Sequence, residues 1–229
     1  MSGKEIYPSH RGDERKNTEG QHFFWGSFSE EEKITAWLSF FMADKGAAQA
    51  KARSYCAEYG TFAELCAAEH EGKVVLFPPT EQTMVQKQVI EEMSIRLLYS
   101  HLGDRNVLDS PERIASYFMA CLSWQKNEQF RVLFLDENSN LLADKVLFSG
   151  TVDFVPVYPR QVALQILSLG AKGIVLVHNH PGGDPTPSKE DDALTRRMRK
   201  ICILLGCELK DHMIISRGGW VSMAQSGML

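Results

Sequence analysis

The sequence of 229 residues contains no long hydrophobic run, and this absence excludes a membrane-spanning helix. Its apolar runs are short, as at residues 174–177, whereas a helix that crosses a bilayer needs roughly 18 consecutive apolar residues. Residues 1–22 are polar, carry charges of both signs and have no apolar stretch like that of a secretory signal. We therefore interpret residues 1–28 as a disordered tail and expect no contact with a membrane.

The sequence also lacks paired cysteines and a large excess of either charge. Its five cysteines are odd in number and include no Cys-x-x-Cys pair, which favours reduced, mostly buried thiols in a cytoplasmic protein. The 25 basic and 29 acidic residues give a net charge of −4, so the whole molecule is not a polycation that seeks nucleic acid, although a local basic patch stays open. With 44% hydrophobic and 24% charged residues, the composition is typical of a globular protein.

Capping residues and apolar spacing predict a mostly helical first half. Capping boxes of the S/T-x-x-E type begin at Ser29 and at Thr61, and the glycines at 46, 60 and 72 mark helix ends. A longer helix is expected at 81–102, and Ser110-Pro111 is typical of a further helix start that runs to about residue 122. We place a helical domain at 29–105 and a second domain at 110–229.

Short apolar runs separated by turns predict an α/β fold for the second domain. The continuous apolar run at 173–177 is typical of a strand in the centre of a sheet. The other expected elements are strands at 130–135, 141–148, 208–216 and 220–223, an extended piece at 151–157, and helices at 162–169 and 188–205.

The most informative segment follows the apolar strand and contains two histidines. His178 and His180 are two residues apart at the carboxyl end of a strand, so both imidazoles point to the same face. A loop with three prolines and two glycines then returns the chain toward Asp191 in the first turn of the next helix. Two histidines and one carboxylate leave a fourth tetrahedral position open for water, which is the layout of a catalytic zinc site.

A simpler interpretation of the same residues stays open. A single His-x-His is usually unrelated to metal binding, and Ser188-x-x-Asp191 is also a plausible capping box that needs no function. The two interpretations are compatible, because a capped first turn would hold Asp191 rigidly. The residues alone do not choose between a metal site and a structural loop.

The spacing of these residues resembles a known motif. His178-x-His180-Pro, then Ser188 and Asp191, is similar to the JAMM motif of JAB/MPN-type metallopeptidases at every signature position. The segments HNHPGGDPTPSKEDDALT at 178–195, FSGT at 148–151, YPR at 158–160 and DHMI at 211–214 resemble the RadC family, which usually has serine at the position of Gly182. The resemblance implies a JAB/MPN-like, cytidine-deaminase-like mixed sheet flanked by helices, preceded by a small all-α domain of helix-hairpin-helix type.

The resemblance also implies roles for five residues. His178, His180 and Asp191 match the ligands of a zinc ion. Glu128 matches the upstream glutamate that accepts a proton from the water and delivers it to the leaving group. Ser188 matches the motif serine, whose hydroxyl is expected to donate a hydrogen bond to the oxyanion of a tetrahedral intermediate. The implied activity is hydrolysis of an amide or isopeptide bond in a protein or peptide.

Other functions and arrangements stay open beside this one. The name of the family implies a DNA-repair protein that binds or cuts DNA, and a fold kept as a non-catalytic scaffold is a further alternative. Asp211-His212 is interpreted as structural, because a histidine in a late strand is more often a satisfied structural residue. A triad of Ser188, His212 and an aspartate has compatible spacing but no nucleophile-elbow context.

The helical half is expected not to bind DNA. Residues 30–72 hold four basic side chains against eight acidic ones and lack the Gly-hydrophobic-Gly turn with which such hairpins hold phosphate. This fragment should show no salt-sensitive binding to duplex DNA above the non-specific level, with a Kd on the order of 10⁻⁴ M. A low-salt titration with micromolar affinity and a steep salt slope would contradict this expectation.

Overall fold

The computed structural model describes residues 28–77, 79–103, 106–150 and 159–229. The chain forms two compact units, one that ends at residue 77 and one at 78–229. The predicted tail, apart from Phe28, and the extended piece expected at 151–157 lie outside the described residues. Each unit has its own hydrophobic core.

The first unit contains three helices, α1 (Glu30–Ser39), α2 (Lys45–Tyr59) and α3 (Phe62–His70). The predicted capping boxes are present, because Ser29 and Thr61 each accept a hydrogen bond from the backbone of the glutamate three residues later. The helices enclose a small apolar core, whose fully buried members are Ile34, Leu38, Ala48, Ala52 and Leu65.

Helix α4 (Glu81–Gly103) belongs to the second unit, whereas the sequence predicted it as part of the helical domain at 29–105. The compact units divide after residue 77, whereas the sequence interpretation extended the helical domain to residue 105. Leu102 is buried, and Ile95 and Leu98 pack against the same core as helix α5 (Pro111–Leu122). The sequence predicts the helical pattern of α4, but not the core against which the helix packs.

Five strands of the second unit form one mixed sheet in the order β2-β1-β3-β4-β5. Strand β3 pairs with β4 in parallel, and the remaining neighbours are antiparallel. The predicted α/β fold with a mixed sheet flanked by helices is therefore confirmed. The strands are β1 (Glu128–Leu135), β2 (Leu141–Gly150), β3 (Gly173–Asn179), β4 (Glu208–Ser216) and β5 (Gly219–Ser222).

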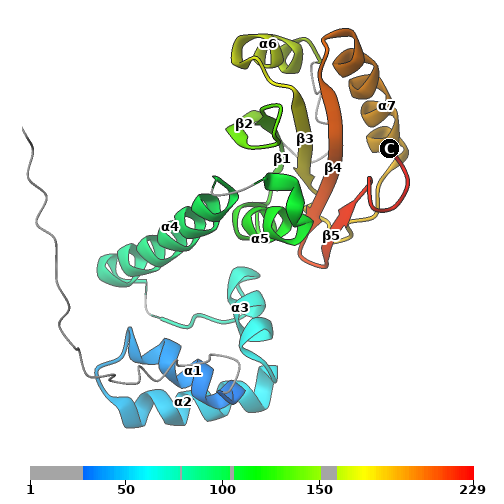
Figure 1. Cartoon of the computed structure of the whole chain (residues 1–229). Coiled ribbons are helices and arrows are strands. Elements are labelled where there is room, and N and C mark those ends of the chain that lie inside the picture. The colour runs from blue at the N-terminus through cyan, green and yellow to red at the C-terminus, as the bar shows by residue number, and fades with distance from the viewer. Residues whose placement is uncertain (1–27, 78, 104–105, 151–158) are drawn as a thin grey trace, which may run out of the picture. The chain divides into compact units, whose positions relative to one another are not determined.

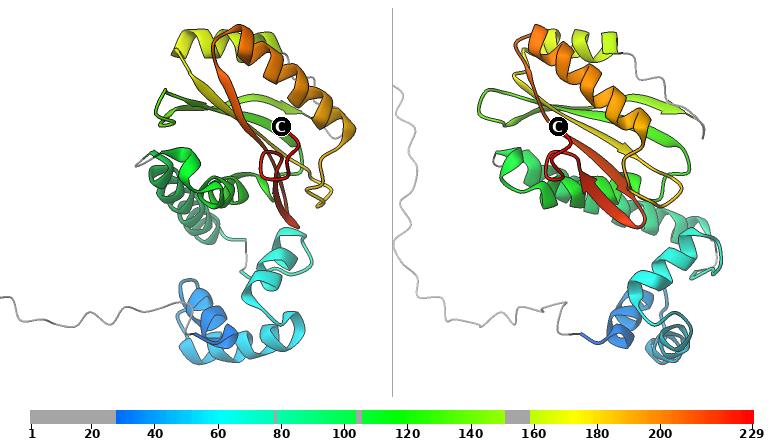
Figure 2. Two further views of the ribbon diagram at one scale, coloured as in Figure 1. Left: turned by 45° about the vertical axis from the view of Figure 1, so that its right-hand side comes forward. Right: turned by 90° about the vertical axis from the view of Figure 1, so that its right-hand side faces the viewer.

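Helices cover both faces of this sheet (Figure 1). One face packs on α4 and α5, and the other packs on α6 (Pro159–Leu169) and α7 (Lys189–Leu204). Two further views separate these layers (Figure 2). Every residue of β3 is buried, as expected for a central strand covered on both faces. No helix among the described residues is long and apolar enough to cross a membrane.

Helix α7 is the crossover that joins the parallel strands β3 and β4. A parallel connection must return the chain to the starting edge of the sheet, and a helix usually does this. The loop at 180–188 therefore brings the amino-terminal end of α7 next to the carboxyl end of β3. In open α/β sheets, ligands commonly bind at such carboxyl ends.

A buried polar network connects α5, β1 and β2. Arg131 forms an ion pair with Asp144, and the Tyr117 hydroxyl donates a hydrogen bond to Asp144 Oδ2 at 2.8 Å. The Asp144 side chain is 3% exposed, so its charge depends on these partners rather than on water.

Substitution of Asp144 should therefore cost more stability than substitution of Tyr117. Asp144→Ala leaves the Arg131 charge buried without its partner and should lower the free energy of unfolding by about 3 kcal/mol. Tyr117→Phe removes one hydrogen bond and should cost about 1 kcal/mol. Urea unfolding of both variants measures the difference, and equal costs would contradict the proposed importance of the ion pair.

Candidate metal centre

The two histidines of the motif lie at the carboxyl end of the central strand. His178 is in β3 and is 1% exposed, whereas His180 follows the strand and is partly exposed. Their Nε2 atoms are 3.0 Å apart, so both rings point to one place, as the i, i+2 spacing predicts. The His180 N–H donates to the Ile215 carbonyl at 2.8 Å, which holds the chain against β4 beyond the end of β3.

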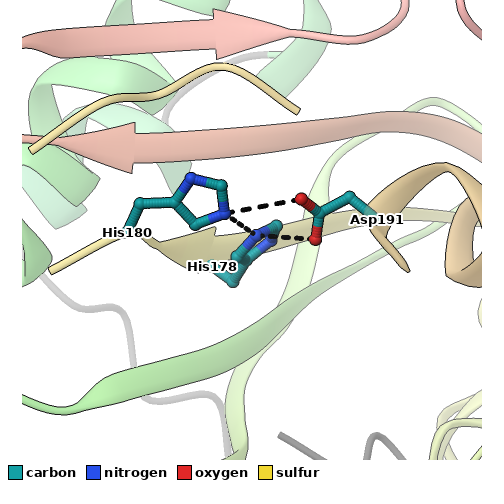
Figure 3. A group of neighbouring side chains, drawn as sticks. All are labelled: His178, His180 and Asp191. Carbon is teal, nitrogen blue, oxygen red and sulfur yellow. Dashed lines mark hydrogen bonds and ion pairs between the residues drawn. The ribbon is translucent and has the colours of Figure 1, made fainter. Parts of the chain in front are cut away.

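Asp191 reaches the same place from the first turn of α7 (Figure 3). Its Oδ1 lies 3.0 Å from His178 Nε2, and its Oδ2 lies 3.4 Å from His180 Nε2. Burial opposes ionisation, but the adjacent His178 and His180 and a hydrogen bond from Ser188 hold the pKa of the Asp191 carboxyl well below its usual range. The site therefore contains a buried carboxylate.

The capping box at Ser188 is present together with this cluster. Ser188 Oγ accepts a hydrogen bond from the Asp191 N–H at 3.1 Å and donates one to Asp191 Oδ2 at 2.6 Å. The serine hydroxyl hydrogen is thus directed at Asp191 and orients the carboxylate. Stabilisation of an oxyanion by Ser188 stays a prediction.

The loop between His180 and α7 is fixed by backbone contacts. Gly183 has a φ of +94°, and its carbonyl accepts hydrogen bonds from the Gly218 N–H at 3.2 Å and from Ser216 Oγ at 2.9 Å. A Cβ at Gly218 would lie 2.6 Å from that carbonyl oxygen, so only glycine permits this approach. Gly182, which replaces the usual serine of the family, is exposed with open space around it.

Glu128 is the first residue of β1 and faces the histidines. Phe130 pairs with His178 across the antiparallel strands, and residues two apart share a face, so Glu128 lies on the His178 side of the sheet. Burial raises the pKa of Glu128, the two histidines lower it, and the Asp191 charge raises it again. The carboxyl group therefore interacts electrostatically with all three members of the cluster.

Asn179 clamps the backbone on both sides of Glu128. Its Oδ1 accepts the Gln129 N–H at 2.8 Å, and its Nδ2 donates to the Asn127 carbonyl at 3.2 Å. The side chain is buried and lies on the face opposite its histidine neighbours. Asn179 has no role predicted from the sequence, although its place between the two histidines was a signal.

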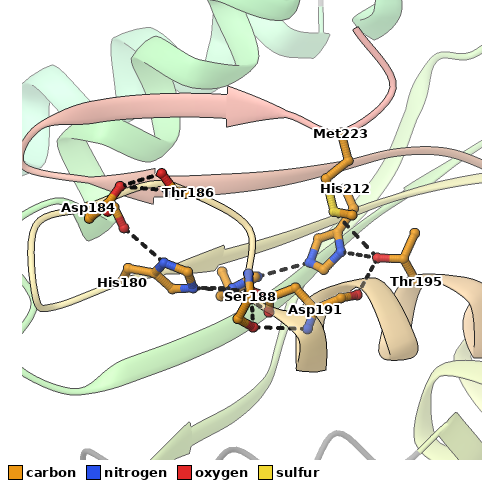
Figure 4. Close-up of polar contacts among 9 residues, drawn as sticks. His180, Asp184, Thr186, Ser188, Asp191, Thr195, His212 and Met223 are labelled. Carbon is orange, nitrogen blue, oxygen red and sulfur yellow. Dashed lines mark hydrogen bonds and ion pairs between the residues drawn. The ribbon is translucent and has the colours of Figure 1, made fainter. Parts of the chain in front are cut away.

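His212 of β4 contacts the cluster directly, which the sequence analysis did not predict (Figure 4). Its Nε2 lies 2.9 Å from His178 Nδ1, and its Nδ1 lies 2.6 Å from Thr195 Oγ1. Complete burial lowers the pKa of His212 well below its usual value. Both ring nitrogens are engaged away from Ser188, so the triad left open above is contradicted.

Asp211 points away from this cluster and has a structural role. Its carboxylate accepts hydrogen bonds from the backbone N–H groups of His212 and Ala224 and from the Ser222 hydroxyl. These contacts attach the end of the chain to β4. The two adjacent residues thus differ in their contacts. Asp211 attaches the end of the chain to β4, whereas His212 contacts the histidine cluster.

The cluster fits a divalent metal ion. His178, His180 and Asp191 each offer one ligand atom, and the three atoms lie within 4.8 Å of one another. His180 Nδ1 lies 2.9 Å from the Asp184 carbonyl, which can only accept, so Nδ1 carries a hydrogen and the neutral ring has its lone pair on Nε2. An outer hydrogen bond of this kind is typical of histidines that bind metals.

The fold and the cluster define a class of protein, a JAB-like α/β domain with a candidate metal site at the carboxyl end of its central strand. Residues 108–228 match the family model described as a RadC-like JAB domain. The chain is 42% identical over 167 residues to a UPF0758 protein of Rhodobacter capsulatus, covering 69% of this chain and 78% of that protein. A UPF0758 protein of Ruegeria pomeroyi is 37% identical over 171 residues, covering 75% and 76%. The chain belongs to the RadC family.

Loss of either histidine should abolish metal binding. His178→Ala and His180→Ala each remove one of three ligand atoms, so neither variant should retain the expected one divalent ion per chain. Equilibrium dialysis followed by elemental analysis measures this, with His101→Ala on α4 as the matched control. Equal metal content in the wild type and both site variants would contradict the assignment.

Proposed function

We propose that this protein is a zinc-dependent hydrolase that cleaves an amide or isopeptide bond with a water molecule as the nucleophile. The observation that carries the proposal is the shared position of four side chains. Three potential ligand atoms lie within 4.8 Å of one another, and the Glu128 carboxyl interacts electrostatically with all three residues. JAB domains include hydrolases, which supports the same class of activity.

His178, His180 and Asp191 would hold the metal ion through two imidazole nitrogens and one carboxylate oxygen. This set favours zinc, which prefers nitrogen and oxygen ligands of this kind. When bound, zinc would act as a Lewis acid and lower the pKa of a coordinated water molecule to about 7. Ser188 keeps the Asp191 carboxylate oriented through the capping box.

Glu128 would act as general base and then as general acid. Its partial burial raises its pKa, which brings its proton affinity closer to neutral pH and suits both steps. The carboxylate accepts one proton from the attacking water, whose oxygen bonds to the carbonyl carbon. The same proton then passes to the leaving nitrogen as the carbon–nitrogen bond breaks. Asn179 restricts the backbone that carries this glutamate.

The alternatives receive less support from the described residues. A scaffold would not need a half-buried glutamate facing three clustered ligand groups. Helix α7 carries a run of exposed basic residues, which are Arg196, Arg197, Arg199 and Lys200. Arg196 is paired with Asp192, which favours a solvated helix face over a surface for DNA. The five cysteines are free thiols, two of them buried and three half-buried, which is compatible with the predicted cytoplasmic location.

Substitution of Glu128 should separate catalysis from metal binding. Glu128→Gln keeps the shape of the side chain but removes its basicity, so zinc content should stay unchanged while turnover falls by about 10²–10⁴-fold. Asp191→Asn should lose both zinc and turnover, because an amide is a poor zinc ligand. Activity is measured on a panel of peptides and lysine-linked isopeptides, with zinc quantified in each sample.

Glu190→Gln is the matched control, because Glu190 is an exposed carboxylate one residue before Asp191. It should retain both zinc and turnover. Full activity of Glu128→Gln would show that another group is the base. A zinc-loaded wild type that cleaves nothing in the panel would favour the scaffold.

A further inference from the structure

A chain of three hydrogen-bonded side chains leads from helix α7 to the first histidine of the metal centre. Thr195 Oγ1 lies 2.6 Å from the Asp191 carbonyl and 2.6 Å from His212 Nδ1. His212 Nε2 lies 2.9 Å from His178 Nδ1. Thr195, His212 and His178 are each about 1% exposed or less, so water does not compete for these contacts.

The chemistry of the first contact assigns the position of each hydrogen. A backbone carbonyl only accepts, and two oxygen atoms 2.6 Å apart need a hydrogen between them, so the Thr195 hydroxyl donates to the Asp191 carbonyl. Because Thr195 Oγ1 already donates its only hydrogen, it must accept a hydrogen bond from His212 Nδ1. A neutral His212 with its hydrogen on Nδ1 has a bare Nε2, which accepts from His178 Nδ1.

We propose that Thr195 and His212 are positioning residues that fix His178 in the tautomer with its hydrogen on Nδ1, so that its Nε2 lone pair faces the candidate metal centre. This proposal rests on the proposed function only where it predicts zinc affinity. The hydrogen on His178 Nδ1 follows from contacts on the outer side of the ring, whereas Nε2 lies 3.0 Å from Asp191 Oδ1, where a bound metal ion would replace any hydrogen on that nitrogen. Neither residue touches the reacting atoms.

Two features of the structure support a positioning role for His212 beside His178. The pairing of β3 with β4 shifts between Ile174 and Val175, so that Lys210 is bulged and His212 pairs with Leu176. Without this shift, Asp211 would occupy the His178 side of the sheet instead. Phe130 closes the other side, with its ring stacked on His178 and edge-on to His212, which keeps the imidazole pair dry.

Thr195→Val is the decisive variant because it keeps the shape of the side chain and removes the hydroxyl. His212 Nδ1 then loses its acceptor, which favours the other His212 tautomer, with its hydrogen on Nε2 and directed at His178 Nδ1. His178 would in turn carry its hydrogen on Nε2, where zinc should bind. We expect zinc affinity to fall about 10–100-fold, the usual effect of losing an outer partner of a ligand. Thr195→Ser restores the hydroxyl and should stay within about threefold of the wild type.

The tautomer of His178 is the decisive measurement, because a purely structural role of Thr195 would leave it unchanged. Long-range ¹H–¹⁵N correlation spectra of metal-free, ¹⁵N-labelled protein distinguish Nδ1–H from Nε2–H in each of the seven histidines, with His178→Ala and His212→Ala spectra used for assignment. Wild type and Thr195→Ser should show a hydrogen on His178 Nδ1, and Thr195→Val should show none on that nitrogen. Zinc affinity is measured by competition with a chelator of known strength, and thermal unfolding shows whether each variant is folded.

Each result decides the proposal. Wild-type His178 with no hydrogen on Nδ1 would overturn it, as would equal spectra and equal zinc affinity of the Val and Ser variants. If Thr195→Val does not fold, the wild-type spectrum still gives the answer. If the wild type binds no zinc, the proposed function fails, while the spectrum still tests the tautomer independently.

Discussion

The parallel pairing of β3 with β4 is the constraint on which the candidate site depends. Parallel strands cannot be joined by a tight turn, so the chain must leave β3, pass through α7 and return. This crossover brings Asp191, at the start of α7, to the end of the strand that carries His178. It also lays His212 of β4 beside His178. One topological requirement thus assembles a potential ligand set and its outer support.

The surroundings of the site explain how a polar cluster is tolerated at the edge of an apolar core. The face of the sheet under α6 and α7 is filled by apolar side chains up to Phe130, whose ring packs on His178. Beyond this point buried polar groups pair with one another, among them Nδ1 of His178 and both ring nitrogens of His212. Burial costs little when the groups are paired, and it strengthens their electrostatic coupling. The raised pKa of Glu128 follows from the same burial.

The sequence predicted elements more reliably than it predicted their partners. Capping boxes and apolar spacing located the helices, because both signals act within one or two turns. The helix α4 was expected from its pattern and placed with the first helical domain, whereas it lies in the second compact unit. Its buried contacts through Ile95, Leu98 and Leu102 belong to the core of the second unit, and helical periodicity does not specify which core a helix covers.

By itself the sequence determined the candidate ligand set, because His178, His180 and Asp191 are joined by one strand end, one short loop and one capped helix start. Their meeting depends on local geometry that spacing encodes. The remaining parts were decided by tertiary structure. Glu128 has no local signature and reaches the site only through the antiparallel register of β1 with β3. The place of His212 depends on a single bulged residue in β4, and a one-residue change of register moves every following side chain to the other face of a sheet.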